Sequence, residues 1–292
     1  TSTASSDKVW RAHLAPTAAG GPFTIAFSAS TGETASLTDV LFGDVYLCGG
    51  QSNMVFELAR NEHAEAYIKQ ADSYPDIRLF TTGITSSKVP LKDLRGVTQR
   101  WSRGSSQSVR GPSPRFAYFS AVCWFFGKGV YDGLGGKVPI GLVSNNQGGT
   151  MVEQWMPKDV SKPCGHSSTG ELFNAMVVPY TVGPMAVTGF TWYQGEQDMM
   201  GKPDLPDQNR NYTCTQAAMI KHWRGLFRKP RAFFGIVQLS TWFPNSSSEQ
   251  DTDPRLIAEL RDQQLASGDF LPGIAFATAA DRGAGANIHP PY

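Results

Sequence analysis

Residues 44–54 read Asp-Val-Tyr-Leu-Cys-Gly-Gly-Gln-Ser-Asn-Met, and this stretch decides the fold. The apolar run 45–48 is typical of a buried strand. Two glycines end it, and because glycine adopts backbone angles that other residues avoid, a sharp turn is expected there. Such a turn lifts the Ser52 hydroxyl out of the sheet edge beside free backbone N–H groups, which is what acyl transfer requires. The alternative is an ordinary strand-to-helix turn with Ser52 as a helix cap.

The chain beyond this turn alternates strand-like and helix-like segments. Such alternation predicts a mainly parallel sheet covered by helices on both faces, with ligands bound at the carboxyl ends of the strands. The predicted strands are 45–48, 77–81, 138–144, 186–193, 232–239 and 273–277, and the predicted helices are 117–134, 171–180, 209–227 and 255–266.

The segment before residue 44 has a different pattern. Short extended runs at 9–14, 23–28 and 35–41 are separated by glycine and proline, with no helical periodicity. We therefore expect an N-terminal β extension or partial β module at residues 1–43 and the main domain at residues 44–292.

Composition limits the function classes. The chain has 292 residues, of which 40% are hydrophobic, so it can bury a sizeable core. Its net charge of +1 provides no basic surface for nucleic acid. No apolar run reaches the roughly 18 residues that span a membrane. No glycine-rich phosphate loop occurs, so we expect no nucleotide cofactor.

The cysteines and the N-glycosylation sequons give evidence on the cellular compartment of the protein. None of the cysteine spacings is Cys-x-x-Cys, so no zinc site is expected. Cys48 and Cys123 lie in apolar runs and are expected to be buried thiols, whereas Cys164 and Cys214 lie in polar sequence and could pair in an oxidising compartment. The sequons at 211–213 and 245–247 lean towards a secretory route, with a lysosomal or extracellular glycoprotein as the expectation.

The ends of four predicted segments carry the residues of an active site. Ser52 follows the first strand, Gly148 and Gly149 follow the third, Gln194 and Glu196 follow the fourth, and His289 lies near the carboxyl end. Each is ordinary alone, since the glycines could form a plain turn, 194–196 a solvated loop and His289 a surface residue. In a parallel sheet they gather at one edge and supply nucleophile, base and oxyanion donors.

These motifs resemble the sialate O-acetylesterase family of the SGNH hydrolases, near the carbohydrate acetylesterases. The resemblance rests on Gly-Gly-Gln-Ser-Asn-Met at 49–54, Gly-Gly-Thr at 148–150 before Glu-Gln-Trp at 153–155, Trp-Tyr-Gln-Gly-Glu at 192–196 and Ile-His-Pro at 288–290. Weaker similarity at 10–45 and 119–127 extends it over most of residues 8–290.

The resemblance implies a three-layer α/β/α, flavodoxin-like SGNH-hydrolase domain with a serine nucleophile and no metal or other cofactor. By position, Ser52 matches the nucleophile, His289 the base, and Gly149 or Gly148 the glycine that donates an oxyanion N–H. Gln194 takes the place of the oxyanion amide, and Glu196 is expected to brace its loop.

The chain departs from the family pattern near its carboxyl end. Many SGNH enzymes have aspartate three residues before the histidine, where this chain has Ala286. Asp281 is the nearest upstream carboxylate and is expected to orient His289, unless a backbone carbonyl does so. The family usually continues well beyond Ile-His-Pro, so the domain is expected to be truncated at Tyr292.

The expected activity is removal of O-acetyl groups from sialic acid, the expected partner, through an acetyl-enzyme. The alternatives are an acetylesterase acting on another acetylated sugar such as xylan, and a non-catalytic binding or structural protein that keeps the hydrolase fold. A sialic acid site needs a cation for the sugar carboxylate, and the candidates are Arg60, Arg115 and Arg282.

Overall fold

The protein is described by a computed structural model that covers residues 6, 10, 12, 14–112, 118–166, 168, 170–183, 185–199, 211–242, 254–285 and 287–291. Its centre is a seven-stranded sheet in the order β5-β4-β6-β3-β7-β8-β9. All neighbours pair in parallel except β5, which runs antiparallel to β4 at one edge. The strands are β3 (Asp44–Gly50), β4 (Ile77–Thr82), β5 (Val97–Arg103), β6 (Ile140–Asn146), β7 (Gly189–Tyr193), β8 (Phe233–Gln238) and β9 (Ile274–Thr278).

The six predicted strands of the main domain are confirmed, and β5 is the one that the sequence analysis missed. Apolar runs made the parallel strands visible, because strands buried on both faces read as nearly continuous hydrophobic sequence. β5 reads Val-Thr-Gln-Arg-Trp-Ser-Arg and buries only Gln99. An exposed edge strand of this composition has no apolar run to reveal it.

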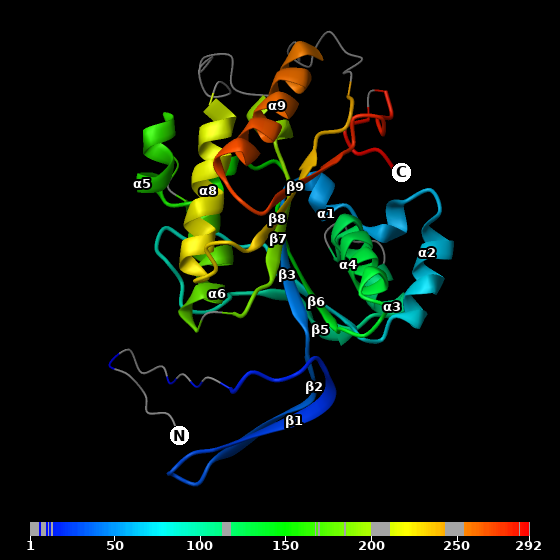
Figure 1. Cartoon of the computed structure of the whole chain (residues 1–292), viewed down its shortest axis with the longest axis vertical. Helices are drawn as coiled ribbons and strands as arrows, with labels where there is room; N and C mark the ends of the chain where they lie inside the picture. Colours follow the sequence, from blue (N-terminus) through cyan, green and yellow to red (C-terminus); the bar gives the residue numbers. More distant parts are fainter. Residues whose placement is uncertain are drawn as a thin grey trace.

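Helices cover both faces of the sheet, which gives three layers (Figure 1). One layer holds α1 (Ser52–Val55), α2 (Ala64–Gln70), α3 (Ser106–Arg110) and α4 (Ala121–Gly133), and the other holds α5 (Lys158–Ser161), α6 (Pro179–Val182), α8 (Tyr212–Leu226) and α9 (Pro254–Ala266). The three-layer α/β/α prediction is confirmed. The short elements are α7 (Glu196–Met199), the 3-10 turns η1 (Leu58–Arg60), η2 (Ala71–Ser73), η3 (Val152–Trp155), η4 (Lys162–Cys164) and η7 (Ser267–Phe270), and the π-helical turn η5 (Phe173–Val177).

Packing of α4 on the sheet depends on a small residue. A Cβ atom on Gly127 would lie 2.4 Å from Leu142 of β6, so the helix backbone approaches the strand more closely than a side chain would allow. Trp124 of the same helix is 1% exposed, and Leu142 is fully buried.

The helix predicted at 171–180 is not continuous in the structure, because it divides into η5 and α6.

The N-terminal segment forms a two-stranded antiparallel hairpin, β1 (Gly20–Ser28) and β2 (Thr34–Phe42), which extends from the base of the main domain (Figure 1). Two of the three predicted N-terminal strands are confirmed, but the described residues between 9 and 14 lie in no strand. Asp39 of β2 ties the hairpin to the main sheet through Arg78 of β4, at 2.6 Å, and Arg103 of β5, at 2.9 Å.

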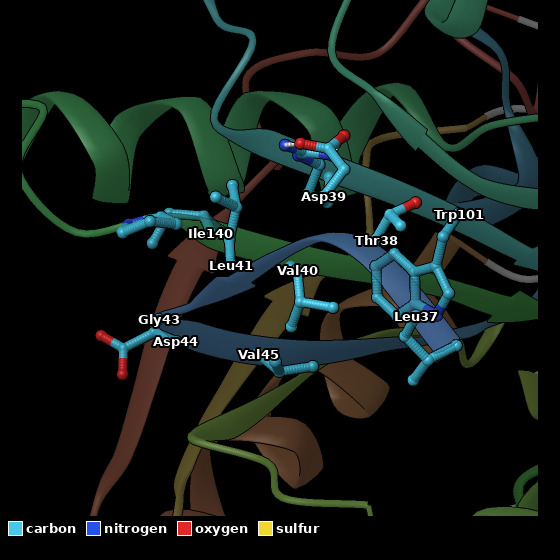
Figure 2. A pocket seen from close by; sticks show the side chains of 13 residues that line it. Leu37, Thr38, Asp39, Val40, Leu41, Gly43, Asp44, Val45, Trp101 and Ile140 are labelled. Carbon is cyan, nitrogen blue, oxygen red and sulfur yellow. Dashed lines mark hydrogen bonds and ion pairs between the residues drawn. The ribbon is translucent and has the colours of Figure 1, made fainter. Parts of the chain in front are cut away.

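A cavity of about 350 Å³ lies where the hairpin meets the main sheet. Figure 2 shows the residues that line it, among them Leu37 and Val40 of β2, Val45 of β3 and Trp101 of β5. Val45 and Ile140 stand at the amino ends of β3 and β6. The cavity is therefore at the opposite end of the strands from Ser52, which follows the carboxyl end of β3.

Two disulfides link elements of the main domain. Cys164 of η4 pairs with Cys214 of α8, which confirms the pairing that the sequence left open. Cys48 of β3 pairs with Cys123 of α4, so the expectation of two buried thiols was wrong. Both are buried, as predicted, but the packing of α4 on the sheet brings them together, and their separation of 75 residues hid this from the sequence. No helix in the described ranges is long and apolar enough to cross a membrane.

Candidate active site

The site begins with the turn that follows β3. Gly50 has φ +147°, and a Cβ there would lie 2.1 Å from the Tyr193 carbonyl oxygen, so only glycine fits. The Gln51 N–H then donates to that same carbonyl at 3.0 Å, which joins the ends of β3 and β7. Ser52 is the first residue of α1 and is half-buried. The cap position belongs to Gln51, so Ser52 is not the helix cap that the alternative interpretation required.

The glycine pair after β6 lies against this turn. The Gln147 N–H donates to the Gly50 carbonyl at 3.1 Å. A Cβ on Gly148 would lie 3.4 Å from the Ser52 Cβ, so the two residues are in contact. Gly149 has φ +67°, a left-handed conformation that glycine adopts without strain. The structure thus brings Ser52, Gly148 and Gly149 together.

Gln194, after β7, lies beneath the turn and is fully buried. Its Nε2 donates to the Thr150 carbonyl at 2.8 Å, to Gln51 Oε1 at 3.2 Å and to an oxygen of Asp198. Its Oε1 accepts from the Tyr212 hydroxyl at 2.9 Å. Its amide hydrogens are engaged within the protein, so here Gln194 holds the 147–150 turn in place. Its role as an oxyanion donor stays a prediction.

Glu196 and Asn53 connect the serine turn to the carboxyl end of the chain. Asn53 Nδ2 donates to Glu196 Oε1 at 2.5 Å and to the Ile288 carbonyl at 3.0 Å. Asn53 is 5% exposed and Glu196 is 4% exposed, and burial raises the pKa of Glu196. Through Asn53, Glu196 is linked to the serine turn, and its role as a brace of its own loop stays a prediction. The sequence analysis did not assign Asn53, although it stands next to the nucleophile candidate.

His289 lies against the helix that Ser52 begins. Its neighbour Ile288 is held by Asn53, and its ring faces Phe56 with 6.4 Å between ring centroids. Its backbone N–H donates to Asn287 Oδ1 at 3.0 Å. Burial of the ring, with a further contribution from the positive charge of Arg60, lowers the pKa of His289.

Asp281 lies on the surface of the segment that follows β9. Its side chain is 71% exposed and faces Arg282, with 3.5 Å between Oδ2 and Nε. Its assignment as the orienting acid stays a prediction, and Ala286 lies outside the described residues.

A second buried carboxylate, that of Asp198, contributes hydrogen bonds to the site and was not assigned from the sequence. Asp198 is 5% exposed, and both its oxygens accept from the Val152 N–H, at 3.2 and 3.3 Å. Burial, reinforced by the negative charge of Glu153, raises the pKa of Asp198 well above its ordinary value. The sequence signal that could have identified Asp198 was its position two residues after Glu196.

The cation candidates differ in their surroundings. Arg60 ends η1, and its positive charge contributes to the lowered pKa of His289. Arg282 faces Asp281, and Arg115 lies outside the described residues. Within the described ranges, no group of three or more His, Cys, Asp or Glu side chains is arranged to hold a metal ion.

Comparison with known proteins places this arrangement in a family. Sialate O-acetylesterases from Pongo abelii and Homo sapiens are 34% and 33% identical over 93% of this chain. The chain spans about half the length of these relatives, 53% of each. A solved carbohydrate acetylesterase from Xanthomonas citri has a TM-score of 0.78 at 30% identity and covers 97% of this chain, which spans 59% of that protein.

A more distant solved structure, a protein from Arabidopsis thaliana, has a TM-score of 0.53 at 16% identity and shows the same fold. It covers 83% of this chain, and this chain covers 87% of it. Residues 42–289 match the family described as carbohydrate esterase, sialic acid-specific acetylesterase. This chain therefore belongs to the sialic acid-specific acetylesterase family of carbohydrate esterases.

Proposed function

We propose that this chain hydrolyses O-acetyl esters of sialic acid through an acetyl-enzyme on Ser52. The observation that carries the proposal is the hydrogen bond from Asn53 to the Ile288 carbonyl, which keeps the His289 segment against the helix that Ser52 begins. Contact between Gly148 and Ser52 adds a backbone turn beside the serine.

In the first half of the reaction, His289 takes the proton from the Ser52 hydroxyl, and Oγ attacks the acetyl carbonyl carbon. The resulting oxyanion is held by the N–H groups of Ser52 and Gly149, each of which is worth about 3 kcal/mol of barrier in sites of this kind. The ester C–O bond then breaks, and the imidazolium returns its proton to the departing sugar oxygen.

In the second half, water attacks the acetyl-enzyme with His289 again as the base. The C–O bond to Ser52 breaks, acetate leaves, and the serine recovers its proton. The base must be neutral at the start of each half. The lowered pKa of His289 suits this requirement, because it keeps the imidazole unprotonated at neutral pH.

The direct test is acetate release from 9-O-acetylated sialic acid by Ser52→Ala and His289→Gln. Each variant is expected to lose at least about 1,000-fold in kcat, as when a member of a serine triad is removed. Ser36→Ala, an exposed serine on β2, is the matched control and should keep full activity. Equal rates from wild type and Ser52→Ala would refute the proposal.

Two alternatives to this function can be tested, one by comparing substrates and the other by labelling Ser52. The Xanthomonas citri relative is a carbohydrate acetylesterase, so another acetylated sugar, such as xylan, is the second candidate substrate. Faster acetate release from acetyl xylan than from acetylated sialic acid would support it. A non-catalytic protein would leave Ser52 unlabelled by a serine-reactive phosphonate.

We also propose that the protein follows the secretory route, to a lysosomal or extracellular location, and carries an N-glycan. Two disulfides are typical of secreted proteins. Asn211, in the sequon Asn-Tyr-Thr, is exposed just before α8, while the second sequon lies outside the described residues.

The glycan test uses protein made in a eukaryotic secretory host. Thr213→Val should remove the mass shift that peptide N-glycosidase produces at Asn211, whereas Thr213→Ser keeps the sequon and should keep the shift. An Asn211 peptide without glycan in the wild type would contradict this part of the proposal.

A further inference from the structure

The turn between α8 and β8 carries a concentration of positive charge. Its residues 228–231 read Arg-Lys-Pro-Arg, and we call this segment the basic turn. No aspartate or glutamate occurs in the sequence between Asp207 and Glu249, although the whole chain has 26 Lys and Arg against 25 Asp and Glu. The net charge of +1 therefore conceals a local excess of positive charge.

The cations of the basic turn are exposed and stand on a backbone that is fixed by hydrogen bonds. Arg228, Lys229 and Arg231 are all exposed. The Lys229 N–H donates to the Arg224 carbonyl at 2.9 Å, and the Ala232 N–H donates to the Lys229 carbonyl at 3.0 Å. A turn held in this way presents its charges in one arrangement, which lowers the entropy cost of binding a ligand.

Arg228 has a backbone conformation that disfavours arginine. Its φ is +55°, in the left-handed region, and it directly follows Phe227, the C-cap of α8. Glycine is the usual residue at this position, because it has no Cβ. Residues held in such conformations cluster at functional sites. An arginine where glycine would be less strained points to a role for the side chain.

A buried arginine lies against the end of the basic turn. Arg224 is 2% exposed, and its Nη2 donates to the carbonyls of Ala232, at 2.5 Å, and Gly273, at 3.3 Å. Its Nε and Nη1 have no hydrogen-bond partner in the described part of the chain. Within the same ranges, neither Arg224 nor any cation of the basic turn forms an ion pair. Since buried charges are normally paired, this group of cations has room for an anion.

The basic turn lies at the opposite end of the sheet from the proposed active site. It precedes Phe233, the first residue of β8, so it stands at the amino end of that strand. Ser52 follows the carboxyl end of β3, and β3, β7 and β8 are parallel. An anion bound at the basic turn therefore occupies a site separate from that of the acetyl ester.

The surroundings of the basic turn favour an acidic polysaccharide over other polyanions. Single-stranded nucleic acid stacks on exposed aromatic rings, and membrane surfaces are bound where cations accompany exposed apolar side chains. Here Trp223 and Phe227 are buried and Leu226 is half-buried. Carboxylate and sulfate groups on a sugar chain need only cationic hydrogen-bond donors, which arginine and lysine supply.

We propose that the basic turn binds acidic polysaccharide chains at a site separate from the esterase site. Arg228, Lys229 and Arg231 pair with carboxylate or sulfate groups of the chain, and the charge of Arg224 reinforces them from the protein side. Binding holds the protein on a polymer of acidic sugars and leaves the Ser52 turn free to react. It does not depend on the esterase activity.

The test measures binding of the 292-residue chain to chondroitin sulfate, an acidic polysaccharide without sialic acid, so that the proposed catalytic site takes no part. The triple variant Arg228→Gln, Lys229→Gln and Arg231→Gln should bind at least about 10-fold more weakly at low salt, because each cation at an anionic surface contributes about fivefold. Added salt should weaken the wild type more steeply than this variant, because fewer charge pairs remain to be screened.

The matched control removes the same charge from exposed positions on α2, β5 and η4. Lys69→Gln, Arg100→Gln and Lys162→Gln together should bind chondroitin sulfate as the wild type does. An equal loss in this control, or no loss in the basic-turn variant, would overturn the proposal. Duplex DNA bound more tightly than chondroitin sulfate at the same salt would overturn the assignment to polysaccharide.

Two single variants separate the charge of Arg228 from its backbone. Arg228→Gly removes the cation and fits the left-handed conformation, so we expect weaker binding with an equal or higher melting temperature. Arg228→Lys keeps the charge and should bind nearly as the wild type. Weaker binding in Arg228→Lys together with a lower melting temperature in Arg228→Gly would assign Arg228 a structural role and remove it from the site.

The esterase proposal and this one can fail independently. The basic-turn variant should release acetate from 9-O-acetylated sialic acid at the wild-type rate, and Ser52→Ala should bind chondroitin sulfate with wild-type affinity. A wild type that binds chondroitin sulfate but releases no acetate would refute the esterase function and leave the polysaccharide site in place. Loss of chondroitin sulfate binding in Ser52→Ala would show that the two sites are not separate.

Discussion

At the scale of single residues, Asn53 is the junction of the site. One side-chain nitrogen donates to one oxygen of a buried carboxylate of α7 and to a carbonyl next to the proposed base. A buried acceptor that loses its donor costs about 1–3 kcal/mol, so the bond to Glu196 contributes to stability as well as to alignment.

We expect Asn53→Ala to lower the free energy of unfolding by about 1–3 kcal/mol and to lower kcat about 10-fold or more, because the His289 segment loses its attachment to α1. Denaturant unfolding and acetate release measure the two effects. Asn61→Ala is the matched control, because the Asn61 side chain accepts a local hydrogen bond from the His63 N–H at 2.9 Å, away from Glu196 and Ile288. Full activity in Asn53→Ala would show that the bond to Ile288 does not position the base.

The pH dependence of the reaction follows from His289. A neutral imidazole is required as base, and the lowered pKa of His289 extends its neutral form to lower pH. The acidic limb of kcat/KM against pH should therefore have its midpoint below the ordinary histidine value of about 6.5. A midpoint above about 7 in the pH profile would contradict this.

At the scale of elements, the site consists of turns at the carboxyl ends of β3, β6 and β7, held in register by the parallel sheet. Gly50 stands opposite Asn146 on one side and Tyr193 on the other. The disulfides act on this arrangement differently. Cys48–Cys123 fastens β3, four residues before Ser52, to α4, whereas Cys164–Cys214 fastens η4 to α8.

We predict a difference between the two disulfide deletions. The pair Cys164→Ser and Cys214→Ser should lower the free energy of unfolding by about 2–4 kcal/mol, with kcat of the folded protein unchanged. The pair Cys48→Ser and Cys123→Ser should lose similar stability and also lower kcat, because β3 carries the serine turn. Denaturant unfolding and active-site titration on the same samples measure both, and equal kcat in the two pairs would contradict the distinction.

At the scale of the whole molecule, the buried acids at the carboxyl edge of the sheet include Glu196 and Asp198. Burial raises the pKa of both, so the folded state keeps their protons at pH values where the unfolded state has released them. Stability from these groups is complete below their unfolded pKa values, near 4, and is lost as pH rises through the folded values. The half-buried histidines His222 and His289 have lowered pKa values and act in the opposite direction.

The expected consequence is a decline in unfolding free energy with rising pH, up to about 1.4 kcal/mol per pH unit for each carboxyl within its titration range. Glu196→Gln should flatten part of this decline, because the amide imitates the protonated acid. Asn53 still finds an acceptor on Gln, and the remaining position replaces Oε2, which has no hydrogen-bond partner within the described part of the chain. Melting temperatures between pH 5 and 8 test this, and parallel curves for wild type and variant would contradict it.

The sequence by itself determined the parallel sheet, the turns that form the candidate site and the family. Buried parallel strands and glycine-ended turns leave local patterns, and the order of strands places their ends at one edge. Only the tertiary structure decided the antiparallel edge strand β5, the Cys48–Cys123 bond, the inward position of Gln194 and the junction at Asn53. The physical reason is distance along the chain: Gln194 meets Gln51 across 143 residues, and Asn53 meets Ile288 across 235. Which partner a buried amide chooses depends on packing that no local pattern records.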